Sequence, residues 1–153
     1  MRSLTRTPPR VPEHRHPRGL VDTSVVIDLD RIDPGELPVA VAVSAATLAE
    51  LAAGPHATSD PEERARRQDR LQRTEAIFEP LPVDAAVARA YGRAYAAVVS
   101  AGRKARGRRA FDLLIAATAL ASGLPLYTRN PSDFAGLDGL LEVVAVEASA
   151  ITP

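Results

Sequence analysis

The chain has 153 residues, a formal net charge of zero and no cysteine. Its length suits one domain, and the lack of cysteine excludes disulfides, thiolate metal sites and cysteine nucleophiles. No stretch approaches the ~20 apolar residues that a membrane-spanning helix needs, and the arginine-containing N-terminus lacks the apolar core of a signal peptide. We therefore expect a cytoplasmic protein.

The charge is distributed unevenly along the chain. Residues 1–19 carry five arginines and one glutamate, and residues 102–109 carry five basic residues and no acidic one, so the rest of the chain is acidic. An acidic body with basic segments is expected of a metal site beside a loop that binds phosphates. A merely solvated loop is the alternative interpretation.

The N-terminal part predicts strands that alternate with helices. Residues 1–18 are rich in Pro and Arg and lack periodicity, so we expect a disordered basic leader. A strand then begins near residue 19, and Asp22 at its end caps a short helix. The apolar run 38–44 predicts a buried parallel strand, and the Ala/Leu-rich run 45–53 predicts a helix.

The rest of the chain continues this alternation. The pattern predicts helices at 61–78, 85–101 and 111–123 and strands at 78–83, 124–128 and 140–146. Such alternation is typical of a mostly parallel sheet with helices on both faces. The sequence therefore predicts one α/β domain over residues 19–147, followed by a C-terminal tail at 148–153.

Four acidic side chains occupy comparable places in this pattern. Asp22 directly follows the first strand, and Glu50 lies one or two helical turns after the second. Asp112 lies near the start of its helix, and Asp133 follows strand 124–128 by a short loop. Because ligands of such sheets bind at the carboxyl ends of the strands, all four can reach one edge. Carboxylates gathered in this way favour a hard cation such as Mg²⁺ or Mn²⁺.

Each acid also has an ordinary structural interpretation. Asp22 can act as a helix cap, Glu50 can face solvent, and Asp133 can stabilise a turn. Asp112 lies in an apolar run, where burial without a partner costs several kcal/mol. It therefore caps its helix, pairs with one of the arginines just before it, or binds a cation.

Four segments together resemble the acidic signature of PIN-domain ribonucleases, in particular the toxins of VapBC-type toxin–antitoxin pairs: VDTSVVIDL, TLAEL, RRAFDLLIAATAL and YTRNPSDF. The resemblance covers about residues 19 to 147, and the basic leader departs from the family pattern. It implies a single-domain α/β/α sandwich around a mostly parallel sheet. It also implies RNA cleavage that depends on Mg²⁺ or Mn²⁺, and inhibition by a small cognate antitoxin.

The resemblance assigns the acidic quartet to Asp22, Glu50, Asp112 and Asp133. The three aspartates are the preferred metal ligands, and Glu50 ligates through water or orients the nucleophile. The bound ions would acidify a water molecule, and the resulting hydroxide would attack a phosphodiester in line. Further residues are expected to support the site or to hold the RNA backbone: Ser24, Thr128 and Asn130 in the first role, and Arg103, Lys104, Arg106, Arg108 and Arg109 in the second.

The resemblance also suggests partners. Structured RNA such as tRNA or rRNA is the implied substrate, and a homodimer can form through the apolar helix at 85–99. An amphipathic segment of the antitoxin is expected to lie over the helices. The same apolar stripes are equally consistent with core packing. The alternatives for the function are a non-catalytic RNA-binding module on this fold and another metal-dependent phosphatase.

Overall fold

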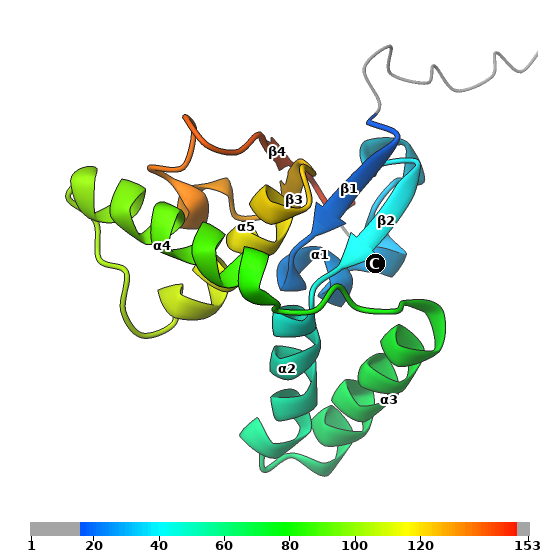
Figure 1. Cartoon of the computed structure of the whole chain (residues 1–153). Coiled ribbons are helices and arrows are strands. Elements are labelled where there is room, and N and C mark those ends of the chain that lie inside the picture. Colours follow the sequence, from blue (N-terminus) through cyan, green and yellow to red (C-terminus); the bar gives the residue numbers. More distant parts are fainter. Residues whose placement is uncertain (1–15, 150–153) are drawn as a thin grey trace, which may run out of the picture.

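A four-stranded parallel sheet organises the chain in the computed structural model, which describes residues 16–149 (Figure 1). The strand order is β2-β1-β3-β4, so β1 and β3 are central. The strands are β1 (Arg18–Val21), β2 (Ala40–Val43), β3 (Leu126–Thr128) and β4 (Val143–Ala145). Because all four run in the same direction, their carboxyl ends meet at one edge. The expected mostly parallel sheet is thus confirmed.

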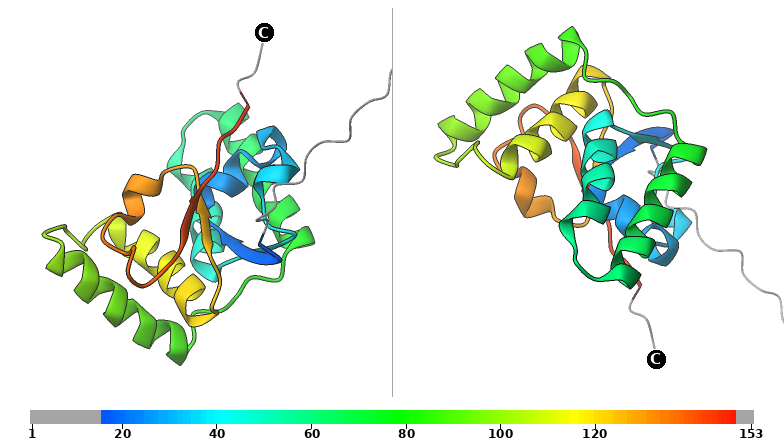
Figure 2. Two further views of the ribbon diagram at one scale, coloured as in Figure 1. Left: turned by 90° about the horizontal axis from the view of Figure 1, so that it is seen from above. Right: turned by 90° about the horizontal axis from the view of Figure 1, so that it is seen from below.

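Neighbouring residues of each strand face opposite layers, as the pleat requires. One face buries Leu20, Ala42 and Leu126 against α4 (Ala85–Ser100) and α5 (Arg109–Ala121). The other face buries Val21, Val43 and Tyr127 under α1 (Thr23–Ile27) and the segment that follows it. Views from above and below show the helices on both sides of the sheet (Figure 2). The fold is therefore the expected α/β/α sandwich.

The helices begin and end where local chemistry predicts. Aspartate or serine side chains accept a backbone N–H at the start of four of the α-helices. Gly102 and Gly123 follow α4 and α5 with positive φ angles of 74° and 65°, which glycine adopts without strain. The remaining helices are α2 (Ala45–Ala53), α3 (Pro61–Ile77), η1 (Leu29–Arg31), η2 (Pro34–Glu36), η3 (Gly54–Ala57) and η4 (Pro131–Phe134).

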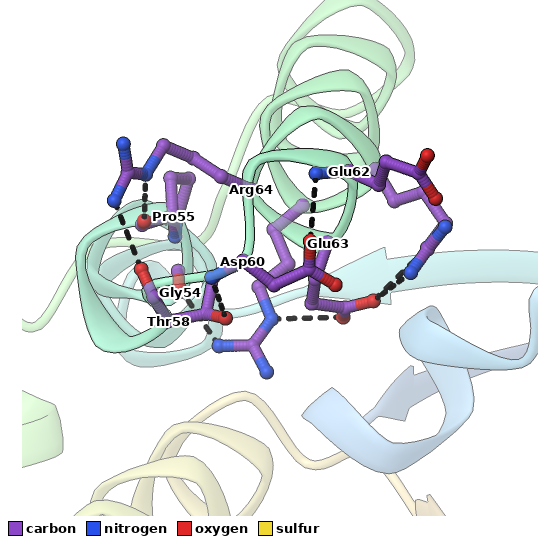
Figure 3. A network of polar contacts seen from close by, with 9 residues as sticks. Gly54, Pro55, Thr58, Asp60, Glu62, Glu63 and Arg64 are labelled. Carbon is purple, nitrogen blue, oxygen red and sulfur yellow. Dashed lines mark hydrogen bonds and ion pairs between the residues drawn. The ribbon is translucent and has the colours of Figure 1, made fainter.

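Helices α2 and α3 form a hairpin that extends from the end of the sheet to which β1 and β2 point (Figure 1). Arginines of α3 stabilise the turn between the two helices (Figure 3). Arg64 donates to the carbonyl oxygens of Pro55 and Thr58, and Arg67 donates to that of Gly54. Arg67 also pairs with Glu63 at 3.0 Å. These contacts give the charged helix a fixed place although few of its side chains are buried.

The structure differs from the sequence prediction at three places. Residues 78–83 form no strand; Leu81 makes a single bridge to Ser44, since Pro80 and Pro82 on either side have no N–H to continue a ladder. The strand expected at 140–146 is shortened to β4. The structured chain also extends past both expected domain boundaries, because the carbonyl oxygens of His16 and Pro17 accept hydrogen bonds and the N–H of Ser149 donates one.

The rest of the predicted leader and tail, residues 1–15 and 150–153, lies outside the described residues. Within the described part, no helix is long and apolar enough to cross a bilayer.

Candidate active site

Asp22 lies at the carboxyl end of β1 and is almost fully buried, with 5% of its surface exposed. One oxygen accepts hydrogen bonds from Ser24 Oγ at 2.5 Å and from the Val25 N–H, and the other accepts from Thr128 Oγ1 at 2.6 Å. Burial raises its pKa and these hydrogen bonds lower it, with burial the larger cause. Asp22 is therefore the N-cap of α1, and the same hydrogen bonds hold its carboxylate in a fixed position at the end of β1.

Asp112, in the first turn of α5, reveals how the acids are arranged. Its pKa is raised to about 6, first by burial and then by the negative charges of Asp133, Glu50 and Asp22, while Arg109 lowers it. A like charge raises a pKa only when it is nearby. The charges of Asp133, Glu50 and Asp22 are thus near enough to act on Asp112, although the four acids come from four separate segments. Among the described residues, Asp112 makes no ion pair with the arginines that precede it.

Glu50 is half-buried on α2 and faces the start of α1. The hydroxyl of Thr23 donates to Glu50 Oε1 at 2.7 Å, and it lies 3.2 Å from the hydroxyl of Thr47. Sequence reasoning missed both threonines. The available signals were the place of Thr23 directly after Asp22 and the spacing of Thr47 and Glu50, which are three residues apart and share a helix face.

Asp133 is exposed in η4, beyond β3. Thr128 connects this segment to Asp22, because its hydroxyl accepts from the Asn130 N–H at 3.0 Å while donating to Asp22. Asn130 therefore contributes its backbone to the site. Arg103 Nη2 donates to the carbonyl oxygen of Ser132 at 3.2 Å, so this predicted RNA-binding side chain also holds the turn that carries Asp133.

The basic segment 102–109 leads directly into α5 and thus to Asp112. Lys104, Arg106 and Arg108 are exposed, whereas Arg103 and Arg109 are half-buried. None of these five side chains forms an ion pair with a described residue. Three of them are therefore free to meet a ligand beside the acids.

The chemistry of the four acids suits a divalent cation. All four side chains offer carboxylate oxygens, which suit Mg²⁺ or Mn²⁺, and the raised pKa of Asp112 records an excess of negative charge that a cation would neutralise. In residues 16–149, however, no three acidic or histidine side chains lie close enough together to ligate one ion directly. Because Mg²⁺ usually keeps several of its waters, the residues fit an ion held partly through water.

The PIN domain family matches residues 19–140. Ribonuclease VapC5 of Mycobacterium tuberculosis is 38% identical over 128 residues, which are 82% of this chain and 91% of that protein.

Solved structures give the same result. The VapBC-5 structure from M. tuberculosis matches with a TM-score of 0.74 and 39% identity, covering 85% of this chain and 99% of that one. FitAcB from Neisseria gonorrhoeae matches with a TM-score of 0.64 and 28% identity, covering 81% and 94%. The residues that match the PIN domain include all four acids, since Asp22, Glu50, Asp112 and Asp133 fall within 19–140. The chain therefore belongs to the PIN-domain family, in its VapC-type branch.

Proposed function

We propose that this protein is a Mg²⁺- or Mn²⁺-dependent endoribonuclease and the toxin of a type II toxin–antitoxin pair. The observation that carries the proposal is the convergence of four carboxylates around Asp112 at the carboxyl edge of the sheet. The similarity to Ribonuclease VapC5 supports the reaction class. Structured RNA such as tRNA or rRNA is the substrate that we expect.

The residues divide the work between holding an ion and placing the substrate. Asp22, Asp112 and Asp133 would hold the cation, and Glu50 would reach it through water. A divalent ion bound there supplies acidification of a water and neutralisation of charge on the leaving oxygen. Thr128 fixes Asp22 from the neighbouring strand, so the deepest carboxylate is in place before any substrate arrives.

The exposed cations beside α5 would bind the RNA backbone. Lys104, Arg106 and Arg108 have no internal partner among the described residues, so contact with phosphates costs no existing ion pair. Such contacts position a substrate without reading its sequence. The choice of RNA therefore depends on shape and on contacts outside this segment.

The experiment that tests the proposal is cleavage of total RNA with Mg²⁺ or Mn²⁺. We expect Asp22→Asn and Asp112→Asn to lower the rate by at least about a hundredfold with the fold retained, because each removes one charge of the cation site. Mapping of the cut positions identifies the RNA. Undiminished cleavage by both variants in excess EDTA would sink the metal mechanism, and activity on p-nitrophenyl phosphate but not on RNA would favour a phosphatase.

An antitoxin is the partner that we propose, since the similar VapBC-5 structure belongs to the VapBC family of toxin–antitoxin systems. A pocket of about 240 Å³ lies between α1 and the C-terminal part of α3. Its apolar residues include Val26, Leu29, Ile77 and Phe78, and arginines and aspartates surround them. This chemistry suits an amphipathic segment with apolar and acidic side chains. Arg70 of this rim makes no ion pair with a described residue and is available to an acidic group.

We also propose a homodimer through α4. The helix buries Val87, Ala94 and Val98, as expected of an ordinary core helix, but leaves Tyr95 and Val99 37% and 50% exposed. Half-exposed aromatic and branched side chains on a helix face are suited to a contact with a second copy.

A further inference from the structure

We propose that a chain of three hydroxyl groups, from Ser44, Thr47 and Thr23, fixes the carboxylate of Glu50 and makes Thr23 a positioning residue of the site. The inference rests on the proposed function, in which Glu50 takes part. Thr23 Oγ1 lies 2.7 Å from Glu50 Oε1, the hydroxyl oxygens of Thr23 and Thr47 are 3.2 Å apart, and those of Ser44 and Thr47 are 3.3 Å apart.

The direction of these hydrogen bonds follows from counting protons. A hydroxyl donates one proton and accepts through its lone pairs, whereas an ionised carboxylate only accepts. Thr23 therefore gives its proton to Glu50, the proton between the two threonines comes from Thr47, and Ser44 supplies the proton of the last pair. The Ser44 hydroxyl polarises that of Thr47, which in turn polarises that of Thr23, so the hydrogen bond from Thr23 to Glu50 is strengthened.

The chain has few alternatives because its inner members are buried. Ser44 and Thr47 are completely inaccessible to solvent, so their hydroxyls must find partners inside the protein. Ser44 is also the cap of α2, since its oxygen accepts from the Thr47 N–H at 3.0 Å. The start of α2 is thus anchored at the end of β2, and its second turn carries Glu50.

Glu50 needs such an anchor for an electrostatic reason. Its charge contributes to the raised pKa of Asp112, so the two carboxylates repel each other. The hydroxyl of Thr23 opposes that repulsion from the first residue of α1. Because Thr23 directly follows Asp22 in the chain, the same helix start sets the position of two acids that belong to different elements.

Thr23→Val, which removes the hydroxyl and keeps the shape, is the central test. We expect kcat for RNA cleavage to fall about 10- to 100-fold, the effect of losing a hydrogen bond to a charged group, with KM changed less than about twofold. Mn²⁺ binding by calorimetry should weaken in parallel. Thr23→Ser, which keeps the hydroxyl, should restore both values. Thr118→Val is the matched control, because Thr118 is a fully buried threonine whose hydroxyl donates to Leu114 within α5.

Glu50→Gln separates this inference from the proposed function. If Glu50→Gln is impaired while Thr23→Val behaves as the wild type, the hydroxyl chain has no positioning role. Equal losses in Glu50→Gln and in Thr23→Val/Glu50→Gln would support it, since Thr23 then acts only through Glu50. If the wild type cleaves no RNA, the proposed function fails, and the Mn²⁺ affinities still decide the inference. Thr23→Ala replaces Thr23→Val if the latter does not fold.

Discussion

The pKa of a carboxyl group rises when other carboxylates lie near it, and Asp112 shows this effect in this protein. Its pKa of about 6 comes from burial together with three neighbouring negative charges. Burial also raises the pKa of Asp22, but hydrogen bonds from Ser24 and Thr128 lower it. The surroundings of the two aspartates therefore differ: hydrogen-bond donors hold the Asp22 carboxylate in place, whereas three charges of the same sign act on Asp112.

This difference predicts how stability depends on pH. The pKa of Asp112 lies above the 3.8 of an unperturbed aspartate, so between these values the folded state binds more protons than the unfolded state. The free energy of unfolding therefore falls as the pH rises through this window. In EDTA, we expect thermal unfolding to show that the wild type loses stability relative to Asp112→Asn as the pH rises from about 4 to about 6.

A second condition tests the cause of that loss. Addition of Mg²⁺ at the higher pH should stabilise the wild type more than Asp112→Asn, because the variant lacks one of the charges. A stability difference that stays constant with pH would contradict the raised pKa.

At the scale of elements, the segment before α5 and the α2–α3 hairpin differ in how they use their arginines. In the hairpin, Arg64 and Arg67 donate to backbone carbonyl oxygens, so they fix the turn. In the basic segment, Arg103 does the same for η4 by donating to Ser132, while Arg106 and Arg108 stay exposed. Arginine is thus structural at positions 64, 67 and 103, whereas Arg106 and Arg108 are available to a ligand.

The exposed arginines give a quantitative prediction for RNA binding. We expect Arg106→Ala/Arg108→Ala to weaken binding and to reduce the slope of log K against log salt by about 1.4 to 1.8, or ~0.7 to 0.9 for each lost phosphate contact. Binding measured over a range of salt concentrations checks this. Arg64→Ala on the hairpin is the control that should leave the slope unchanged, and an unaltered slope in the double variant would mean that the segment is only solvated.

At the scale of the whole molecule, the short helix α1 connects the four acids to the pocket between α1 and α3. Asp22 is the N-cap of α1, and Val26 and Ile27 of that helix line the pocket. A partner in the pocket would thus contact the same short helix that carries an acid and Thr23. This arrangement allows an antitoxin to be recognised by residues that take no part in cleavage.

A substitution in the pocket should weaken antitoxin binding without lowering RNA cleavage. We expect Ile77→Asp to weaken antitoxin binding at least about a hundredfold, because an unpaired carboxylate would be buried in an apolar contact. RNA cleavage by the free protein should remain. Ile77 is 70% exposed, and Val39→Asp is a matched control because Val39 is 66% exposed and does not line the pocket. Antitoxin that still binds and inhibits Ile77→Asp as it does the wild type would place the contact elsewhere.

The sequence by itself determined the layer architecture and which acids to consider. Apolar runs that alternate with helical segments predict the parallel strands. Capping residues such as Asp22, Asp60 and Asp84 predict helix starts that the structure confirms. These features depend on neighbours within a few residues, so local chemistry suffices to predict them. The segment 78–83 was mistaken for a strand because its apolar character was clear, while its prolines forbid a continuous ladder.

Only the tertiary structure decided how the acids are held. The bond from Thr128 to Asp22 joins residues 106 positions apart, and that from Thr23 to Glu50 joins residues 27 apart. The structure also decided that Arg103 supports η4 while Arg106 remains exposed. Hydrogen bonds and electrostatic repulsion act over a few ångströms in space, and the chain alone does not state which distant residues the sheet will bring within that range.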